Sequence, residues 1–470
     1  MILLILAVAA VLRLIGLNQS LWLDEAINVN NAAGLSFKDL IFNYSLGDFH
    51  PPLYHVLLST WIGFFGSSEI SVRIPSVIVA VATVYFTFLI AQKLFETKTG
   101  LVAATLMATA PLAIYYSQEA RMYALAAFFA SVSVYFFLSL LKKDTLVSWF
   151  GFISATTLML YTDYLPYLLI PIYIVYIFIN RKRISIHTKR ALVPALISIL
   201  AFILPWLLIF PSQLKTGLAA SAASPAWAQV VGSPSLQSLA ITFVKFTIGR
   251  ISQDNNLIYA LLFAPPALFV AFLFLLSLFR LSHFRSFLHY WLFGPIILAF
   301  ILAFFIPVYA YFRLLFVLPA YYIIWASAAT IVNWPPLTRI LLVIALLINL
   351  TSASIYFLNP KFQREDWRSA TAYIHQNSTL ATLVLFESNF TAAPFDYYNR
   401  GEVKAAGAFD SSPEKIKSFS TSYDKIYLFQ YLSGITDPQG QVFRELTRLG
   451  YINTTTRDFP GVGFIYEFKK

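Results

Sequence analysis

Two adjacent acids, Asp24 and Glu25, follow an apolar N-terminal run in the segment SLWLDEAINVNN, residues 20–31. A carboxylate in such a place can take a proton from an attacking hydroxyl group, which is general-base catalysis. The pair can also be merely solvated, or it can cap a following helix through free backbone N–H groups. The residue types therefore allow a catalytic role for these acids without requiring one.

A second group of polar side chains lies further along the same long segment, in the motif GDFHPPLYH. Asp48 and His50 stand there just before two prolines, which stiffen the backbone and hold it extended. Together with Asp24, these side chains are of the types that bind divalent cations, although nothing in the sequence requires a metal or another cofactor. His50 can equally be an ordinary turn residue.

Charged side chains also stand at the ends of later apolar runs. Arginine binds a phosphate through paired hydrogen bonds, so acids combined with arginines suit a reaction between a hydroxyl group and a phosphate ester. When the leaving group is already a phosphate, one base and several cations suffice. The same arginines can instead only reach toward lipid head groups. These candidate substrate-binding residues are Arg73, Glu119, Arg121, Asp163 and Arg313.

The composition indicates what kind of molecule must position these groups. Of the 470 residues, 59% are hydrophobic and only 12% are charged, and the mean hydropathy is +0.70. Repeated apolar runs of about 17–25 residues, each long enough to cross a bilayer as a helix, continue to residue 358. The chain is therefore predicted to be an all-α polytopic membrane protein. The absence of cysteine excludes a disulfide framework and a thiolate metal site.

The net charge of +11 is concentrated in short loops, which indicates membrane topology rather than a nucleic-acid partner. By the positive-inside rule, these loops and the N-terminus face the cytoplasm, while the loops 18–70 and 211–255 and everything after 358 face outward. About eleven helices are predicted, near 1–17, 71–94, 100–116, 121–141, 147–161, 164–180, 190–210, 256–279, 286–306, 313–333 and 337–358. The basic loops contain Lys93 and Lys98, Lys142 and Lys143, residues 181–190, Arg280 and Arg285, and Arg339.

The sequence changes character after residue 358. Segments REDWRSATAYIHQ and QVFRELTRLGY have helical amphipathic spacing, and TLVLFES, KIYLFQY and VGFIYEF are short apolar runs typical of strands. We therefore predict two domains. Residues 1–358 form a membrane domain whose first outward loop, 18–70, holds the candidate site, and residues 359–470 form a small extracytoplasmic α/β domain.

Several of these motifs, taken in order, resemble a known family. They are SLWLDEA, DFHPPLYHVLL, FGSSEISVRIPS, YSQEARMYAL, YTDYLPYL, YFRLLFVLPA and REDWRSATAYI. They resemble the dolichyl-phosphate-mannose protein mannosyltransferases and their bacterial relatives of the aminoarabinose-transferase type, which are integral-membrane glycosyltransferases of the GT-C fold. The likeness is strongest over residues 20–125 and thinner to 330.

The resemblance implies an enzyme that takes a sugar, a hexose or a pentose, from a polyprenyl-phosphate donor at the outer face of the membrane. The sugar would pass with inversion to an acceptor hydroxyl group, and the acceptor class, lipid, glycan or protein, stays open. Asp24 is then the base or holds the acceptor, and Glu25 assists it. Asp48 and His50 shape the site or, in members that use a metal, bind the cation.

The remaining roles also follow from the resemblance. Glu119 and Arg121 match the QEAR element and support the acceptor or the donor phosphate. Arg313 is the preferred contact for the donor phosphate, with Arg73 second. The C-terminal segment is not the β-trefoil insertion of the eukaryotic protein mannosyltransferases, so a protein acceptor is not implied, and no motif selects the sugar.

Two other classes of function stay open at this point. A transporter or flippase for a lipid-linked or other solute would keep ionisable groups near the middle of the membrane and show paired halves with broken helices. Here the acids fall at the predicted outward ends, and no duplicated half is visible. A membrane-anchored binding protein that works through its tail would not need the acid-rich first loop.

Overall fold

The structure is a computed structural model that describes residues 1–223, 232, 234–278, 282–331, 334–408 and 412–470. The chain forms two compact units. The first, which we call the membrane unit, contains Met1–Leu17, Leu35–Gly66 and Ser71–Leu358. The second, which we call the C-terminal unit, contains Asn18–Gly34, Ser67–Ile70 and Asn359–Lys470.

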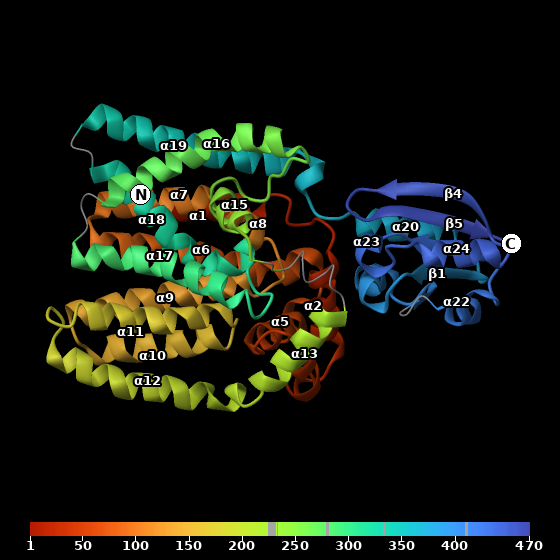
Figure 1. Ribbon diagram of the computed structural model, residues 1–470, viewed down its shortest axis with the longest axis horizontal. Coiled ribbons are helices and arrows are strands. Elements are labelled where there is room, and N and C mark those ends of the chain that lie inside the picture. Colours follow the sequence, from red (N-terminus) through yellow and green to blue (C-terminus); the bar gives the residue numbers. More distant parts are fainter. Residues whose placement is uncertain (224–231, 233, 279–281, 332–333, 409–411) are drawn as a thin grey trace. The chain divides into compact units, whose positions relative to one another are not determined.

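Helices that lie side by side make up the membrane unit (Figure 1). Its early elements are α1 (Ile2–Leu14), α3 (Phe37–Asp39), the π-helix η1 (Leu40–Tyr44), α4 (Ser45–Gly47), α5 (Leu53–Phe65), α6 (Glu69–Leu94), α7 (Thr97–Thr109), α8 (Pro111–Ser117) and α9 (Tyr123–Lys142). The later ones are α10 (Leu146–Leu160), the 3-10 helix η2 (Leu165–Leu168), α11 (Leu169–Ile179), α12 (Ile186–Leu207), α13 (Phe210–Ala223), α15 (Leu236–Ile248), α16 (Asn256–Leu278), α17 (His283–Leu302), the 3-10 helix η3 (Tyr311–Val317), α18 (Leu318–Ile331) and α19 (Pro335–Leu358).

Every apolar run predicted to be helical contains a helix, apart from end residues that lie outside the described part of the chain. Among the described residues, seven helices are long and apolar enough to cross a membrane, and the bent pair α7–α8 makes an eighth candidate. Shorter apolar helices, α1, α5, α10, η2–α11 and α15, accompany them. The chain is thus a polytopic membrane protein, as predicted, while the number of eleven crossings stays a prediction.

The expectation of loops at 18–70 and 211–255 was wrong in part. The first segment contains helices α2 (Leu23–Gly34) and α5, and the second contains α13 and α15. These helices have 12 to 14 residues, too few to cross a bilayer, so a search for long apolar runs passes over them. Local signals were present: Ser235 and Ser238 form a capping box that starts α15.

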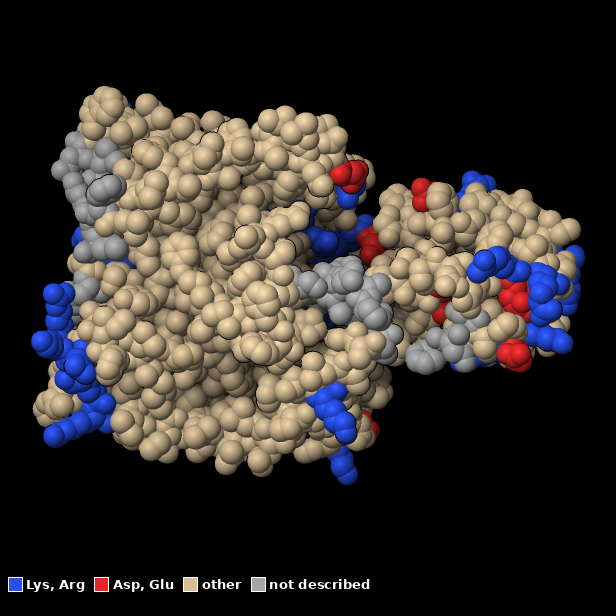
Figure 2. Space-filling view, in the orientation of Figure 1, with Lys and Arg blue, Asp and Glu red and all other residues tan. Residues whose placement is uncertain are grey.

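Basic side chains gather at one end of the membrane unit. Figure 2 shows Lys and Arg atoms at the end of the helices around α11 and α12, at the lower left of the view. The segment 181–190 joins these two helices, and Lys142 and Lys143 stand at the end of the adjacent α9. Arg280, which the predicted topology also uses, lies outside the described residues.

The C-terminal unit is an α/β domain with a five-stranded sheet of order β2-β1-β3-β5-β4. Its strands are β1 (Thr382–Phe386), β2 (Lys404–Gly407), β3 (Lys425–Phe429), β4 (Ile452–Phe459) and β5 (Gly463–Lys469); β1 pairs in parallel with β2 and β3, and β5 pairs antiparallel with β3 and β4. Its helices are α2, η4 (Pro360–Phe362), α20 (Trp367–Asn377), η5 (Asn389–Ala392), α21 (Ala393–Asn399), α22 (Pro413–Ser420), α23 (Ser433–Thr436) and α24 (Gln441–Arg448). The predicted fold class, a helical membrane protein with a small C-terminal α/β domain, is confirmed.

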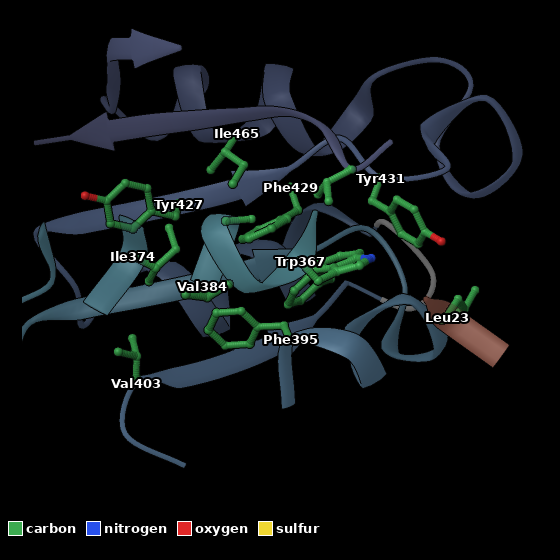
Figure 3. Close-up of a cluster of buried hydrophobic side chains, with 13 residues drawn as sticks. Leu23, Trp367, Ile374, Val384, Phe395, Val403, Tyr427, Phe429, Tyr431 and Ile465 are labelled. Carbon is green, nitrogen blue, oxygen red and sulfur yellow. The ribbon is translucent and has the colours of Figure 1, made fainter. Parts of the chain in front are cut away.

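Side chains alternate between two hydrophobic clusters along the central strands. On β1, Val384 and Phe386 belong to one cluster and Leu383 and Leu385 to the other, as the two-residue period of a strand requires. The first cluster also includes Leu23 of α2 (Figure 3). The helix that carries the acid pair is therefore part of the C-terminal unit.

Candidate active site

Asp48 is the centre of a small polar cluster in the membrane unit. It follows α4 and precedes the two prolines that lead into α5. Its Oδ2 lies 2.8 Å from Nε2 of His55 and 3.4 Å from Nδ1 of His50. Burial alone would raise the pKa of Asp48, but the facing His50 and His55 hold it well below its ordinary value. Asp48 is therefore an anionic anchor and a poor proton acceptor at neutral pH.

Hydrogen bonds tie this cluster to two neighbouring segments. The amide nitrogen of Gln213 in α13 donates to the backbone oxygens of Ser45 and, at 3.3 Å, of His50. Its amide oxygen accepts from the hydroxyl of Tyr164, which in turn accepts from Nε1 of Trp206 at 2.9 Å. The loop that carries Asp48 and His50 is thus held in one conformation by side chains from α12, α13 and the turn after α10.

Asp163, a predicted substrate-binding residue, lies in that turn. Its Oδ1 accepts a hydrogen bond of 2.6 Å from the backbone N–H of Tyr164, and only 4% of its surface is exposed. The carboxylate therefore supports the start of η2, while contact with a substrate stays a prediction.

A break between α7 and α8 positions the QEAR element. The two helices are bent by 58° because Ala110 is extended and Pro111 has no N–H to continue the ladder. Met107 would normally accept from the N–H four residues on, which is missing at Pro111. Arg13 of α1 supplies the donor instead: its Nη2 lies 3.3 Å from the oxygen of Met107, and its Nη1 lies 3.0 Å from that of Ala108.

Further polar contacts complete the support for this break. Asn349 of α19 donates to the oxygen of Leu106 at 3.0 Å and to Oγ1 of Thr109 at 3.1 Å. Gln118, the first residue of QEAR, donates to the backbone oxygens of Arg13 at 3.0 Å and Ile15 at 2.6 Å. The turn that carries Glu119 and Arg121 is therefore fixed from α1 and α19.

Glu119 and Arg121 are both buried, with 0% and 9% of their surfaces exposed. Glu119 lies near Arg250. Together with Tyr115, Tyr116 and Tyr311, it favours the charged form of Arg250 and so raises the pKa of that guanidinium. Arg250 itself keeps access to solvent, and its guanidinium stacks 4.7 Å from the ring of Tyr115 and donates to that residue's hydroxyl. This group of one exposed arginine with several tyrosines suits an anionic ligand.

The turn before Arg250 fits closely against α8. Gly249 has φ +72°, and a Cβ there would meet Cβ of Pro111 at 3.1 Å. Nearby, the amine of Lys245 donates to the oxygen of Ile251 at 2.6 Å, and burial, followed by the charge of Arg250, lowers the pKa of Lys245 to about 8. A second cation thus stands beside the arginine.

The two other predicted arginines differ in their surroundings. Arg73 is buried, with 1% exposed, and its Nη1 donates to the oxygen of Leu17 at 2.9 Å, where it holds the end of α1. Arg313 in η3 is half-buried; its Nη1 donates to the oxygen of Val308 at 3.4 Å, and its Nε has no hydrogen-bond partner within the described part of the chain. Arg313 therefore has one buried donor, Nε, that no group in the described part of the chain satisfies.

The acid pair lies in the C-terminal unit, in the first turn of α2. Glu25 is fully buried, whereas Asp24 is partly exposed. Of the two, only Asp24 has solvent-accessible surface.

In the membrane unit, the structure brings together Asp48 with His50, and Glu119 with Arg250. The sequence places His55 among the polar side chains of the first outward loop and Arg250 among outward-facing charged groups, but neither was chosen as a site residue. His55 is the partner of Asp48. The only feature of the sequence that pointed to this pairing was the position of His55 one turn after the two prolines. Arg250 follows a helix that the search for long apolar runs passed over. Over the described residues, no group of three or more acidic or histidine side chains is arranged to hold a metal ion.

Comparisons with known proteins agree with this architecture. The family model described as dolichyl-phosphate-mannose-protein mannosyltransferase matches residues 49–209. No curated protein sequence matches the chain.

Solved structures match nearly the whole chain. ArnT from Cupriavidus metallidurans, both in the apo state and bound to undecaprenyl phosphate, matches with a TM-score of 0.57 at 12% identity, covering 99% of this chain and 97% of that one. The oligosaccharyltransferase of Archaeoglobus fulgidus in complex with Zn and sulfate matches with a TM-score of 0.57 at 13% identity, covering 98% of this chain and 72% of that one. The same archaeal enzyme, AglB, in complex with an inhibitory peptide and a dolichol-phosphate matches with a TM-score of 0.55, covering 99% and 74%.

These matches span both units, and the matched family model falls on the segment that holds His50, Glu119 and Asp163. This chain therefore has the GT-C glycosyltransferase fold, of the type found in the protein mannosyltransferases and ArnT.

Proposed function

We propose that this protein is a glycosyltransferase that uses a polyprenyl-phosphate-linked sugar and transfers the sugar, with inversion, to an acceptor hydroxyl group at the outer face of the membrane. The observation that carries this proposal is the match over 99% of the chain to ArnT, an enzyme solved with undecaprenyl phosphate bound. The matched dolichol-phosphate complex of AglB supports the same class of donor. The matched proteins give no support to a transporter or flippase.

The proposed reaction needs one proton acceptor. The acceptor oxygen attacks the anomeric carbon, the bond from that carbon to the phosphate oxygen breaks, and the polyprenyl phosphate leaves with the bonding electrons. We assign the proton of the acceptor hydroxyl to Asp24, because it is the exposed acid of the predicted motif. The depressed pKa of Asp48 makes that residue a poor proton acceptor. Glu25 supports Asp24.

Cationic side chains hold the donor phosphate in this proposal. Arg250 is supported by its exposure and by the tyrosine hydroxyls around it. Arg313, the preferred phosphate contact from the sequence, is supported by its free Nε donor. Arg73 is a weaker candidate because it is buried against the carbonyl of Leu17. Since a phosphate is already a good leaving group, no general acid is needed.

No cofactor is required by this chemistry. A divalent cation is a possible addition, because the matched archaeal enzyme was solved with Zn, and the predicted ligands in this chain are Asp24, Asp48 and His50. We expect turnover to persist in EDTA, because cationic side chains already face the leaving group. Activity that is lost in EDTA and restored by one divalent cation would contradict this expectation.

The proposed orientation places the N-terminus and the basic loops in the cytoplasm, and the first outward loop and the C-terminal domain outside. In this division residues 1–358 are the transferase domain and 359–470 an extracytoplasmic domain. The chain has no cysteine, so single cysteines can be introduced without background. A cysteine at Lys470 should react with an impermeant maleimide in intact cells, whereas one at Lys182 should react only after lysis. The reverse pattern would refute the orientation.

The proposed function is tested with purified protein in detergent and a panel of short-chain polyprenyl-phosphate sugars, with lipid, glycan and peptide acceptors. Release of polyprenyl phosphate together with a glycosylated product is the expected result. Liposome transport of a lipid-linked sugar without any transfer would favour the transporter alternative instead.

A further inference from the structure

The C-terminal unit contains the helix that carries the acid pair. Leu23, the residue before Asp24, is buried in the same hydrophobic cluster as Trp367, Phe395 and Tyr431. Figure 3 shows Leu23 next to this cluster, on a chain segment that is separate from the rest of the unit in sequence. The backbone at Asp24 is therefore anchored by side chains that follow it by more than 300 positions.

Polar contacts hold both ends of the first outward loop to helices α20 and α21. The hydroxyl of Tyr398 accepts a hydrogen bond of 2.9 Å from the N–H of Leu21 and donates one of 3.1 Å to Oε1 of Glu69. Arg368 donates from Nη2 to the oxygen of Asn18 at 2.7 Å and to Oε1 of Glu69 at 2.6 Å. Tyr398 and Arg368 therefore each link the beginning of the first outward loop to Glu69 at its end.

The far part of α2 is held as well. The amide of Asn30 donates to the backbone oxygen of Ala393 at the start of α21, at 3.0 Å. With Leu23 fixed in the core at one end and Asn30 at the other, α2 cannot turn about its axis without breaking contacts. This orientation buries Glu25 completely and leaves Asp24 partly exposed.

Asp24 also lies within electrostatic range of the tail. The pKa of Tyr431 is raised well above its ordinary value. Burial is the largest cause, the charge of Glu365 comes next, and the charge of Asp24 contributes least. Tyr431 donates to both oxygens of Glu365 at 3.0 Å. The immediate surroundings of the acid therefore include groups from residues 359–470.

We propose that the C-terminal domain is the positioning element for the catalytic acid, and that Tyr398 and Arg368 are positioning residues for sugar transfer. The inference rests on the proposed function for the role of Asp24. A tail that only recognised an acceptor would not need to bury Leu23 or bond both ends of the first outward loop. Loosening these bonds should change the chemical step, because a misplaced base loses rate before the protein loses its fold.

The test compares Tyr398→Phe with Tyr466→Phe in the full-length protein. Tyr466 is a matched control because its hydroxyl donates to Gln430 at 2.8 Å within the same unit, and its ring packs against the hydrophobic cluster that does not contain Leu23. We expect Tyr398→Phe to speed hydrogen exchange of the α2 amides and to lower kcat about tenfold, as expected when two hydrogen bonds are lost. The affinity for the polyprenyl-phosphate donor should not change, and Tyr466→Phe should match the wild type in all three measurements.

A second pair of variants separates positioning from general damage. Arg368→Lys retains a cation beside Glu69 and should recover part of the rate that Arg368→Ala loses. Faster exchange of α2 in Tyr398→Phe with an unchanged kcat would overturn the inference, and so would an unchanged exchange rate. If the wild type transfers no sugar at all, the proposed function fails, and the exchange measurement alone decides whether the tail holds α2.

Discussion

Arg13 offers the clearest test of how the membrane unit positions its polar site. The side chain is fully buried in α1, yet its guanidinium donates to the backbone oxygens of Ala9, Met107 and Ala108. The carbonyl of Met107 loses its normal helical partner at Pro111. Replacing Arg13 by Met retains much of the volume and removes every donor, so the break between α7 and α8 would lose its support from α1.

The size of the effect follows from the two bonds between helices. A buried carbonyl without a partner costs about 1–3 kcal/mol, but hydrogen bonds between membrane helices contribute on average less than 1 kcal/mol each. Desolvation of the buried guanidinium offsets part of what these bonds contribute. We therefore expect Arg13→Met to lower the free energy of unfolding by about 1–3 kcal/mol.

The assay is unfolding of the purified protein in mixed micelles with increasing SDS, followed by tryptophan fluorescence. Arg339→Met is the matched control, because Arg339 is exposed on α19. Donor turnover should fall more in Arg13→Met than its stability loss explains, since the break that the Arg13 side chain supports leads into the turn that carries Glu119 and Arg121. Equal stability of the two variants would refute the assignment of Arg13 as the support of the broken helix.

Three further predictions concern other parts of the chain. Asp48→Asn should lower transfer about tenfold and also lower the melting temperature, because His50 and His55 lose the anion that they hold in its charged form; steady-state kinetics and melting curves check this, and an unchanged kcat would remove Asp48 from the site. Gly461→Ala should unfold at a lower temperature than Gly440→Ala. Both positions have a positive φ, but only at position 461 would the new Cβ lie 2.9 Å from Cα of Glu365. Equal melting temperatures of the two variants would contradict this clash. Burial raises the pKa of Glu387 to about 8 from 4.5, so the folded state retains a proton that the unfolded chain releases, and stability should fall as pH rises between these values. Glu387→Gln should remove that slope in melting curves from pH 4.5 to 8, and parallel curves would count against the shift.

Sequence periodicity was sufficient for the long elements of the fold. Runs of apolar residues identify helices such as α6, α9 and α19 because a membrane span must be both long and apolar. The strands β1, β3 and β5 were also visible as short apolar runs. Strand β4 was not, because its residues INTTTRDF are mostly exposed at the sheet edge and carry no apolar pattern.

The site was predictable only where partners are close in sequence. Asp48 and His50 are two residues apart, and the prolines after them gave a local reason to expect a fixed geometry. Arg13 could not be understood in this way, because its partners are 94 and 95 residues away. The position of α2 in the C-terminal unit was equally hidden, since it depends on Leu23 packing with residues near the other end of the chain.

The most direct test of the account is sugar transfer by the wild type and by Asp24→Asn, measured as released polyprenyl phosphate and as glycosylated product. The account predicts turnover of at least one donor by the wild type, and a loss of about 100-fold or more in a variant that still folds and binds the donor. A variant as fast as the wild type would contradict the assignment of Asp24 as the base, and Glu119 would become the next acid to test.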